Sequence, residues 1–117
     1  MNYKKGDVVV VKFPFALRNG SEIQKGRPDL VIADNKAKRR YSDIILSAIT
    51  SQIPDEIMEL EILIDPSKET GLIKQSLLRL DFIMTIPKYL VSRKIGRLPR
   101  DILNQANRKI KKSLGLN

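Results

Sequence analysis

The chain contains no cysteine, no histidine and no tryptophan, and aromatic residues make up only 5% of its 117 residues. The lack of cysteine excludes both a disulfide framework and a thiolate metal site. The lack of histidine removes the usual general base at neutral pH and the commonest metal ligand. With so few aromatic rings, extensive recognition of bases by stacking is not expected. Since no carboxylate cage is evident either, the sequence predicts chemistry without a metal or a cofactor.

Long hydrophobic runs are also missing. No apolar run approaches the roughly 18 residues that span a bilayer, and Met1–Lys5 leads into a strand without the hydrophobic core of a signal peptide. We therefore expect a cytoplasmic protein that has no membrane partner. The content of 42% hydrophobic and 30% charged residues is typical of a globular protein, and the length predicts one domain over residues 1–117.

Positive charge is abundant and unevenly spread. The net charge is +9, and residues 88–117 carry nine basic side chains against one acid, Asp101, a balance of +8. The first 87 residues have a balance of only +1. A basic face favours a polyanion, which is a nucleic acid, an anionic membrane or an acidic protein segment. The alternative is a solvated basic helix that keeps the protein soluble.

The hydrophobic pattern predicts a mostly β chain with a helical end. Residues 6–13 are a β-branched run bounded by glycine and proline, and further strands are expected at 27–33, 43–50, 58–64, 76–86 and, as an edge piece, 92–97. After Pro99, apolar residues at helical spacing predict a helix that ends at Gly115. Antiparallel strands in this number favour a small, partly closed barrel.

A single arginine, Arg27, stands where the loop expected at Pro14–Gly26 meets the second strand. Pro28 has no backbone N–H and is tolerated mainly at the first residue of a strand or on an edge, so it predicts the start of this strand. A guanidinium held at such a junction is a permanently charged fork that suits a phosphate or a carboxylate. Taken alone, an arginine at such a junction is more often a solvated loop residue, so Arg27 by itself is a weak signal.

Several short motifs follow one another in an order that resembles the PemK/MazF/Kid toxins of toxin–antitoxin systems. The motifs are Gly6-Asp7-Val8-Val9, Phe13-Pro14-Phe15, Lys25-Gly26-Arg27-Pro28, Leu30-Val31-Ile32, Ala48-Ile49-Thr50-Ser51, Gly71-Leu72, Ser76-Leu77-Leu78-Arg79-Leu80-Asp81 and Ser113-Leu114-Gly115-Leu116. Each motif is loose, but the ordered set is specific and covers nearly the whole chain.

The resemblance implies a fold, an activity and partners. The fold is a small SH3-like, partly open antiparallel barrel with a C-terminal α-helix, usually as a homodimer. The activity is metal-independent, sequence-specific cleavage of single-stranded RNA, in which a ribose 2′-OH attacks the adjacent phosphate. The partner is a cognate antitoxin whose acidic, disordered tail occupies the RNA groove.

The resemblance also implies catalytic positions, which match Arg27, Thr50, Arg79 and Asp81. Arg27 would stabilise charge on the phosphorane, and the Thr50 hydroxyl would donate to the phosphate or orient the 2′-OH. An unperturbed aspartate titrates near ~3.9 and is a weak base at neutral pH. We therefore expect Asp81 to orient Arg79 or to accept a hydrogen bond from ribose. The alternative is an exposed ion pair of roughly 0–1 kcal/mol.

Six further residues are candidates for RNA binding. These are Phe15, Lys25, Pro28, Ser51, Gln75 and Ser76. For Phe15 the alternative is a place in the barrel core, and for Thr50-Ser51 it is an ordinary turn at the end of a strand.

The chain departs from the family pattern at two points. Kid uses a histidine in the first long loop, and this chain has none. Asp29 follows Arg-Pro where the family commonly has a small apolar residue, and in the groove it would repel phosphate or pair with Arg27.

Two other functional classes stay open. A gyrase poison of the CcdB type relies on a C-terminal tryptophan that is absent here, and a non-catalytic RNA- or DNA-binding module would need only the basic C-terminal segment.

Overall fold

The computed structural model describes residues 2–16, 22–34 and 36–116, with the backbone alone for 13–16 and 22–25. Its elements follow the expected order of strands and a final helix. They are β1 (Asp7–Ala16), β2 (Glu22–Val31), β3 (Asp43–Thr50), β4 (Glu61–Ile64), β5 (Ser76–Pro87), the short 3-10 helix η1 (Lys88–Leu90), β6 (Val91–Arg97) and α1 (Arg100–Ser113). Within these ranges, no helix has the length and hydropathy to cross a membrane.

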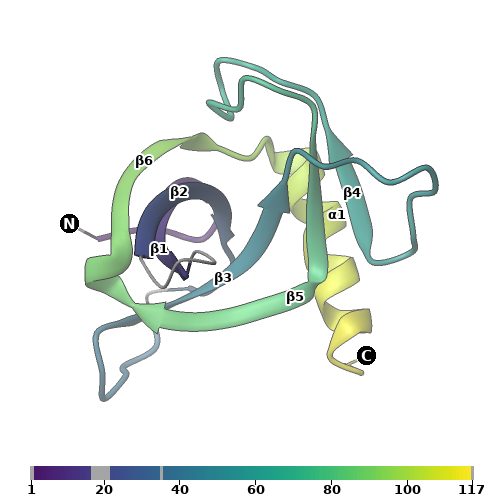
Figure 1. The fold of residues 1–117 in the computed structure, drawn as a ribbon. Helices are drawn as coiled ribbons and strands as arrows, with labels where there is room; N and C mark the ends of the chain where they lie inside the picture. Colours follow the sequence, from purple (N-terminus) through teal and green to yellow (C-terminus); the bar gives the residue numbers. More distant parts are fainter. Residues whose placement is uncertain (1, 17–21, 35, 117) are drawn as a thin grey trace.

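The strands form one antiparallel sheet in the order β4-β5-β3-β2-β1-β6. The sheet curls strongly on itself (Figure 1), and α1 packs against β5. This confirms the expected mostly-β architecture, a partly open antiparallel barrel with a C-terminal helix. The helix also begins and ends where predicted: Pro99 precedes its first turn, and Gly115 follows it with a φ of 71°.

Apolar side chains cover both faces of β1 and β2. Neighbouring residues of a strand point to opposite faces, so Val8 and Leu30 join a cluster that includes the inner face of α1, whereas Val9 and Val31 join another. We call this other group the barrel cluster; it consists of Val9, Val11, Val31, Ile44, Leu46, Ile86 and Val91, with Tyr3, Met84 and Leu90 packed against it. A polar side chain on the barrel face of β2 is therefore held against apolar surface.

The prediction of a loop over Pro14–Gly26 is wrong. β1 continues to Ala16 and β2 already begins at Glu22, so these residues extend a hairpin in which Pro14 pairs with Gln24. The expected turn at Asn19–Ser21 lies outside the described residues. The pairing of β1 with β2 forms strand structure here, although the local turn-forming residues predicted a loop.

The predicted start of the second strand at Pro28 is also wrong, because Pro28 lies inside β2. It pairs with Val10 of β1 but precedes the stretch Asp29–Val31 that pairs with β3. On its side away from β1, β2 is therefore unpaired at Pro28. A residue without an N–H is tolerated at such an edge. Smaller differences concern strand ends: β2 stops at Val31, β4 begins at Glu61 and β5 reaches Pro87.

Candidate active site

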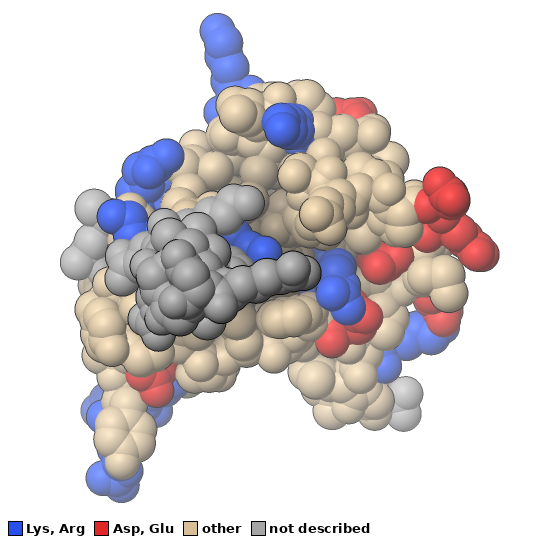
Figure 2. Space-filling model, viewed as in Figure 1, with Lys and Arg blue, Asp and Glu red and all other residues tan. Residues whose placement is uncertain are grey.

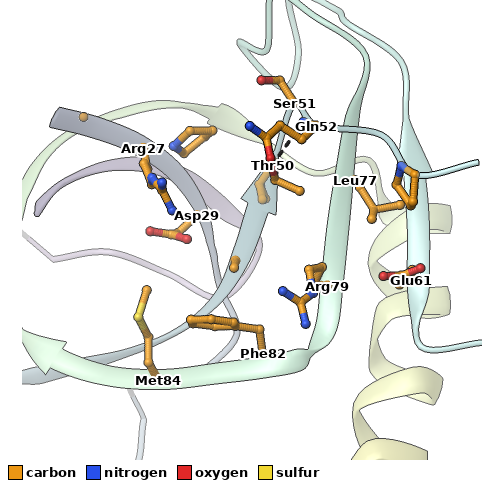
Figure 3. A pocket seen from close by; sticks show the side chains of 15 residues that line it. Arg27, Asp29, Thr50, Ser51, Gln52, Glu61, Leu77, Arg79, Phe82 and Met84 are labelled. Atoms are coloured by element: carbon orange, nitrogen blue, oxygen red, sulfur yellow. Dashed lines mark hydrogen bonds between the residues drawn. The ribbon is translucent and has the colours of Figure 1, made fainter. Parts of the chain in front are cut away.

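A cavity of about 790 Å³ opens between β2, the end of β3, β4 and the middle of β5. Five residues predicted for catalysis or RNA binding line it: Arg27, Pro28, Thr50, Ser51 and Arg79. Figure 3 shows Arg27 on one side and Arg79 on the other, with Thr50 above and Phe82 and Met84 below. The fold thus brings together side chains that are more than 50 residues apart in the chain.

Arg27 reaches the cavity from β2. The residue is exposed and pairs with Val11 of β1. The strand alternation that sends Val31 into the barrel cluster also directs Asp29 and Arg27 to that face. Arg27 is thus anchored on a regular strand rather than on a loop, which limits the positions that its guanidinium can take.

Thr50 is the last residue of β3, and its hydroxyl is held by a local turn. Thr50 Oγ1 accepts a hydrogen bond from the backbone N–H of Gln52 at 3.1 Å, the turn-forming contact typical of serine and threonine. Because Oγ1 accepts in this bond, its own proton remains available for donation. Ser51, the next residue, also lines the cavity.

Arg79 and Asp81 form the ion pair that their spacing predicts. Arg79 Nε donates to Asp81 Oδ1 at 3.2 Å and Nη2 donates to Oδ2 at 3.1 Å, which is a bidentate contact. The hydrogen bond with Asp81 raises the pKa of Arg79, so the guanidinium stays charged. Of these two residues, Arg79 lines the cavity and Asp81 does not.

A register shift in β5 brings an unpredicted aromatic ring to the cavity. Ala48 of β3 pairs with Arg79, but the preceding Ser47 pairs with Ile83, so Leu80–Phe82 have no partner in β3. Such a bulge bends a strand and re-aims side chains. Leu80 is fully buried, whereas Phe82 is 43% exposed in the cavity, and the Arg79 guanidinium lies 5.4 Å from its ring centroid. Strand alternation alone would place both residues in the core.

Two other RNA-binding candidates, Gln75 and Ser76, do not line the cavity. Gln75 Nε2 donates to Asp65 Oδ1 at 3.0 Å, and buried Ser76 donates from Oγ to the Lys74 carbonyl at 2.9 Å. The side chains of Phe15 and Lys25 lie outside the part of the chain that the structure describes. A role in RNA binding for these four residues stays a prediction.

Asp29, which the sequence marks only as a departure, is a buried part of the site. It lines the cavity, yet it is only 2% exposed. Burial raises the pKa of its carboxyl from the ordinary value of 3.8 to about 7, although a hydrogen bond with the Ile49 backbone and the charge of Arg27 both act to lower it. The only signal in the sequence was an acid two residues after Arg27.

The basic C-terminal segment does not contribute to the described cavity, whose lining ends at Met84. Lys94 Nζ lies 3.2 Å from buried Asp7 Oδ1, and Arg97 pairs with the same carboxylate. Figure 2 shows basic side chains spread around one face and acidic side chains gathered beside β4. Among the described residues, no three His, Cys, Asp or Glu side chains lie close enough together to hold a metal ion.

Comparison with known proteins places this geometry in a family. A profile of the PemK-like, MazF-like toxin of type II toxin–antitoxin systems matches residues 4–114. The chain belongs to this family. It is 31% identical over 116 residues to endoribonuclease EndoA of Bacillus subtilis, covering 99% of this chain and 97% of that protein. It is 27% identical over 113 residues to the probable endoribonuclease MazF of Mycolicibacterium smegmatis, covering 97% of each.

Solved structures of the family have the same fold. A mycobacterial endoribonuclease in complex with its cognate antitoxin superimposes with a TM-score of 0.76 at 17% identity, over 99% of this chain and 98% of that one. At this identity, the match concerns the fold. The expected resemblance to PemK/MazF toxins is confirmed by the family profile and by the two relatives.

Proposed function

We propose that this protein is the toxin of a type II toxin–antitoxin system and that it cleaves single-stranded RNA without a metal at the cavity between Arg27 and Arg79. The observation that carries the proposal is the convergence of Arg27, Thr50 and Arg79 on one open cavity. The family and the endoribonucleases with which the chain shares 27% and 31% identity support it. Cleavage proceeds by attack of a ribose 2′-OH on the adjacent phosphate. The O2′–P bond forms as the P–O5′ bond breaks, the 2′-OH releases its proton to solvent, and the leaving 5′-oxygen takes up a proton from solvent.

Each side chain has a defined part in this reaction. Arg27 donates two hydrogen bonds to the non-bridging phosphate oxygens and stabilises the charge that develops on the phosphorane. Thr50 donates its hydroxyl proton to the same phosphate or to the 2′-oxygen. Arg79 supplies a second cation across the cavity. Asp81 orients Arg79, because both of its oxygens accept hydrogen bonds from that guanidinium.

An intact 2′-OH at the cut site is required under this mechanism. Histidine, the usual general base at neutral pH, is absent from the chain, and the proposed mechanism takes its nucleophile from the ribose of the substrate rather than from water. A 2′-deoxy substitution at one mapped cut site should abolish cleavage there and leave cleavage at a second site unchanged. The measurement is gel mapping of an end-labelled RNA in EDTA. Efficient cutting of the substituted site would rule out 2′-OH attack, and loss of all cleavage in EDTA would rule out metal independence.

A cognate antitoxin and a homodimer belong to the same proposal. The net charge of +9 suits an acidic peptide as well as RNA, and the mycobacterial structural neighbour is in complex with its antitoxin. A disordered acidic tail that orders on binding can cover a large surface. Dimerisation would present two such cavities to one antitoxin dimer.

The antitoxin tail should compete directly with RNA for the cavity. In a titration with a non-cleavable 2′-deoxy RNA analogue, saturating tail peptide should displace the analogue, and the association rate of the tail should fall with added salt because long-range charge accelerates the encounter. Arg40→Ala removes one exposed positive charge from the β2–β3 connection, outside the cavity, and serves as the control variant. In this variant the tail peptide should still displace the RNA analogue. Simultaneous binding of peptide and RNA without mutual loss of affinity would contradict neutralisation at this cavity.

A further inference from the structure

A buried carboxylate with an unsatisfied oxygen lies beside the cation that is proposed to bind phosphate. Asp29 and Arg27 are two residues apart in β2, on one face of the strand, and both line the cavity. Asp29 is 2% exposed, and its Oδ2 has no hydrogen-bond partner among the described residues. Buried polar atoms are nearly always paired, so an unpaired carboxylate oxygen at this place calls for an explanation.

The neighbours of Asp29 solvate its charge poorly. On the flanking strands, Asp29 pairs with Val9 of β1 and Ala48 of β3, which are both apolar. Met84, which packs against the barrel cluster, lines the same cavity. The described charged groups that line the cavity are Arg27 beside Asp29 and, from the facing strands, Glu61 of β4 and Arg79 of β5, the latter already paired with Asp81.

We propose that RNA and a proton bind this site together: Asp29 becomes protonated when a phosphate occupies the Arg27 end of the cavity. The inference rests on the proposed function, in which Arg27 binds RNA phosphate. An ionised Asp29 competes with the phosphate for Arg27 and repels it in a region that water screens weakly. A proton taken from solvent onto Oδ2 removes the repulsion and leaves Arg27 to the phosphate. Asp29 acts through Arg27 and is a positioning residue.

The proton can be exchanged under ordinary conditions. Burial raises the pKa of Asp29 to about 7 in the empty site, so near neutral pH both charge states are populated. A phosphate anion beside the carboxyl raises this pKa further, because a like charge disfavours ionisation. By linkage, RNA affinity is then full below pH ~7 and falls at higher pH as the free protein loses the proton that the complex retains.

The experiment measures the affinity of a non-cleavable RNA, 2′-deoxy at the cut site, at constant salt near pH 6 and near pH 8. The wild type should bind about tenfold more weakly near pH 8 than near pH 6. Asp29→Asn keeps the size of the side chain without the charge, so its affinity should change less than about twofold over this range. Calorimetry near pH 8 in two buffers of different ionisation enthalpy should record uptake of about one proton by the wild type and none by Asp29→Asn.

Two variants separate this inference from its alternatives. Glu61→Gln removes the other carboxylate that lines the cavity, and Asp34→Asn removes an exposed one outside it; both should keep the wild-type pH dependence. A pH dependence that persists in Asp29→Asn or disappears in Glu61→Gln would overturn the inference while RNA binding stands. If the wild type binds no RNA at either pH, or if Arg27→Ala binds as tightly as the wild type, the proposed function itself fails.

Discussion

Arg27→Ala should lower the rate of RNA cleavage by about 10²–10³-fold, the usual effect of removing one preorganised donor from a site that stabilises transition-state charge. The fold should survive, because Arg27 is exposed and the alanine backbone can make the same β1–β2 pairing. The measurement is the single-turnover cleavage rate of a short RNA, together with circular dichroism and an unfolding curve of the variant.

Arg27→Lys serves as the matched variant for this prediction. Lysine keeps the positive charge beside Asp29 but lacks the planar fork that contacts two phosphate oxygens. We expect it to retain RNA binding better than Arg27→Ala while its cleavage rate stays well below that of the wild type. Arg40→Ala, on the exposed β2–β3 connection, should cleave as the wild type does. If folded Arg27→Ala cleaves RNA at the wild-type rate, Arg27 is not a catalytic residue.

Asp29→Asn should stabilise the protein by about 4 kcal/mol near pH 8, which corresponds to a pKa raised from 3.8 to about 7. The sign follows from proton binding. Between these two values the folded carboxyl holds a proton that the unfolded one has lost, so the free energy of unfolding falls as pH rises. Asparagine is uncharged at every pH and does not incur this loss. Near pH 4 the variant and the wild type should differ by less than about 1 kcal/mol.

Urea unfolding near pH 4 and near pH 8, at one fixed protein concentration, checks this prediction. The difference between variant and wild type is the relevant quantity, because other groups titrate as well. Glu59, for example, has its pKa lowered by its hydrogen bond to Lys112 and contributes the opposite dependence on pH. Asp34→Asn, at an exposed acid, should leave the free energy of unfolding nearly unchanged at both pH values. An equal effect of Asp29→Asn at both pH values would show that the buried carboxyl keeps an ordinary pKa.

Residues with a strong local pattern were predicted well from the sequence. The β-branched run of β1, the third strand at Asp43–Thr50 and the helix between Pro99 and Gly115 appear within a few residues of their expected bounds. The sequence predicted strands too short for the β1–β2 hairpin, because Pro14 and Pro28 indicate breaks in a strand. Both prolines are accommodated by pairing with strand residues distant in sequence, Gln24 and Val10.

Part of the cavity lining was anticipated from the sequence. Arg27, Thr50 and Arg79 were placed by the ordered motifs, and the structure brings all three to one cavity. Phe82 was missed because its direction depends on a register shift between β3 and β5, which no periodicity within β5 reveals. Gln75 and Ser76 do not line the cavity, and their polar groups bond instead to Asp65 and Lys74 of the β4–β5 connection.

The sequence by itself determined which chemistry was available: no histidine, no cysteine, a net charge of +9, and arginine with threonine at the matching positions. It also determined local structure wherever the spacing of hydrophobic residues followed a single strand or helix period. Only the tertiary structure decided the state of Asp29. A carboxyl group takes its pKa from the solvent and charges around it, and here Val9, Ala48 and Arg27 are brought to it by strand pairing rather than by any local pattern.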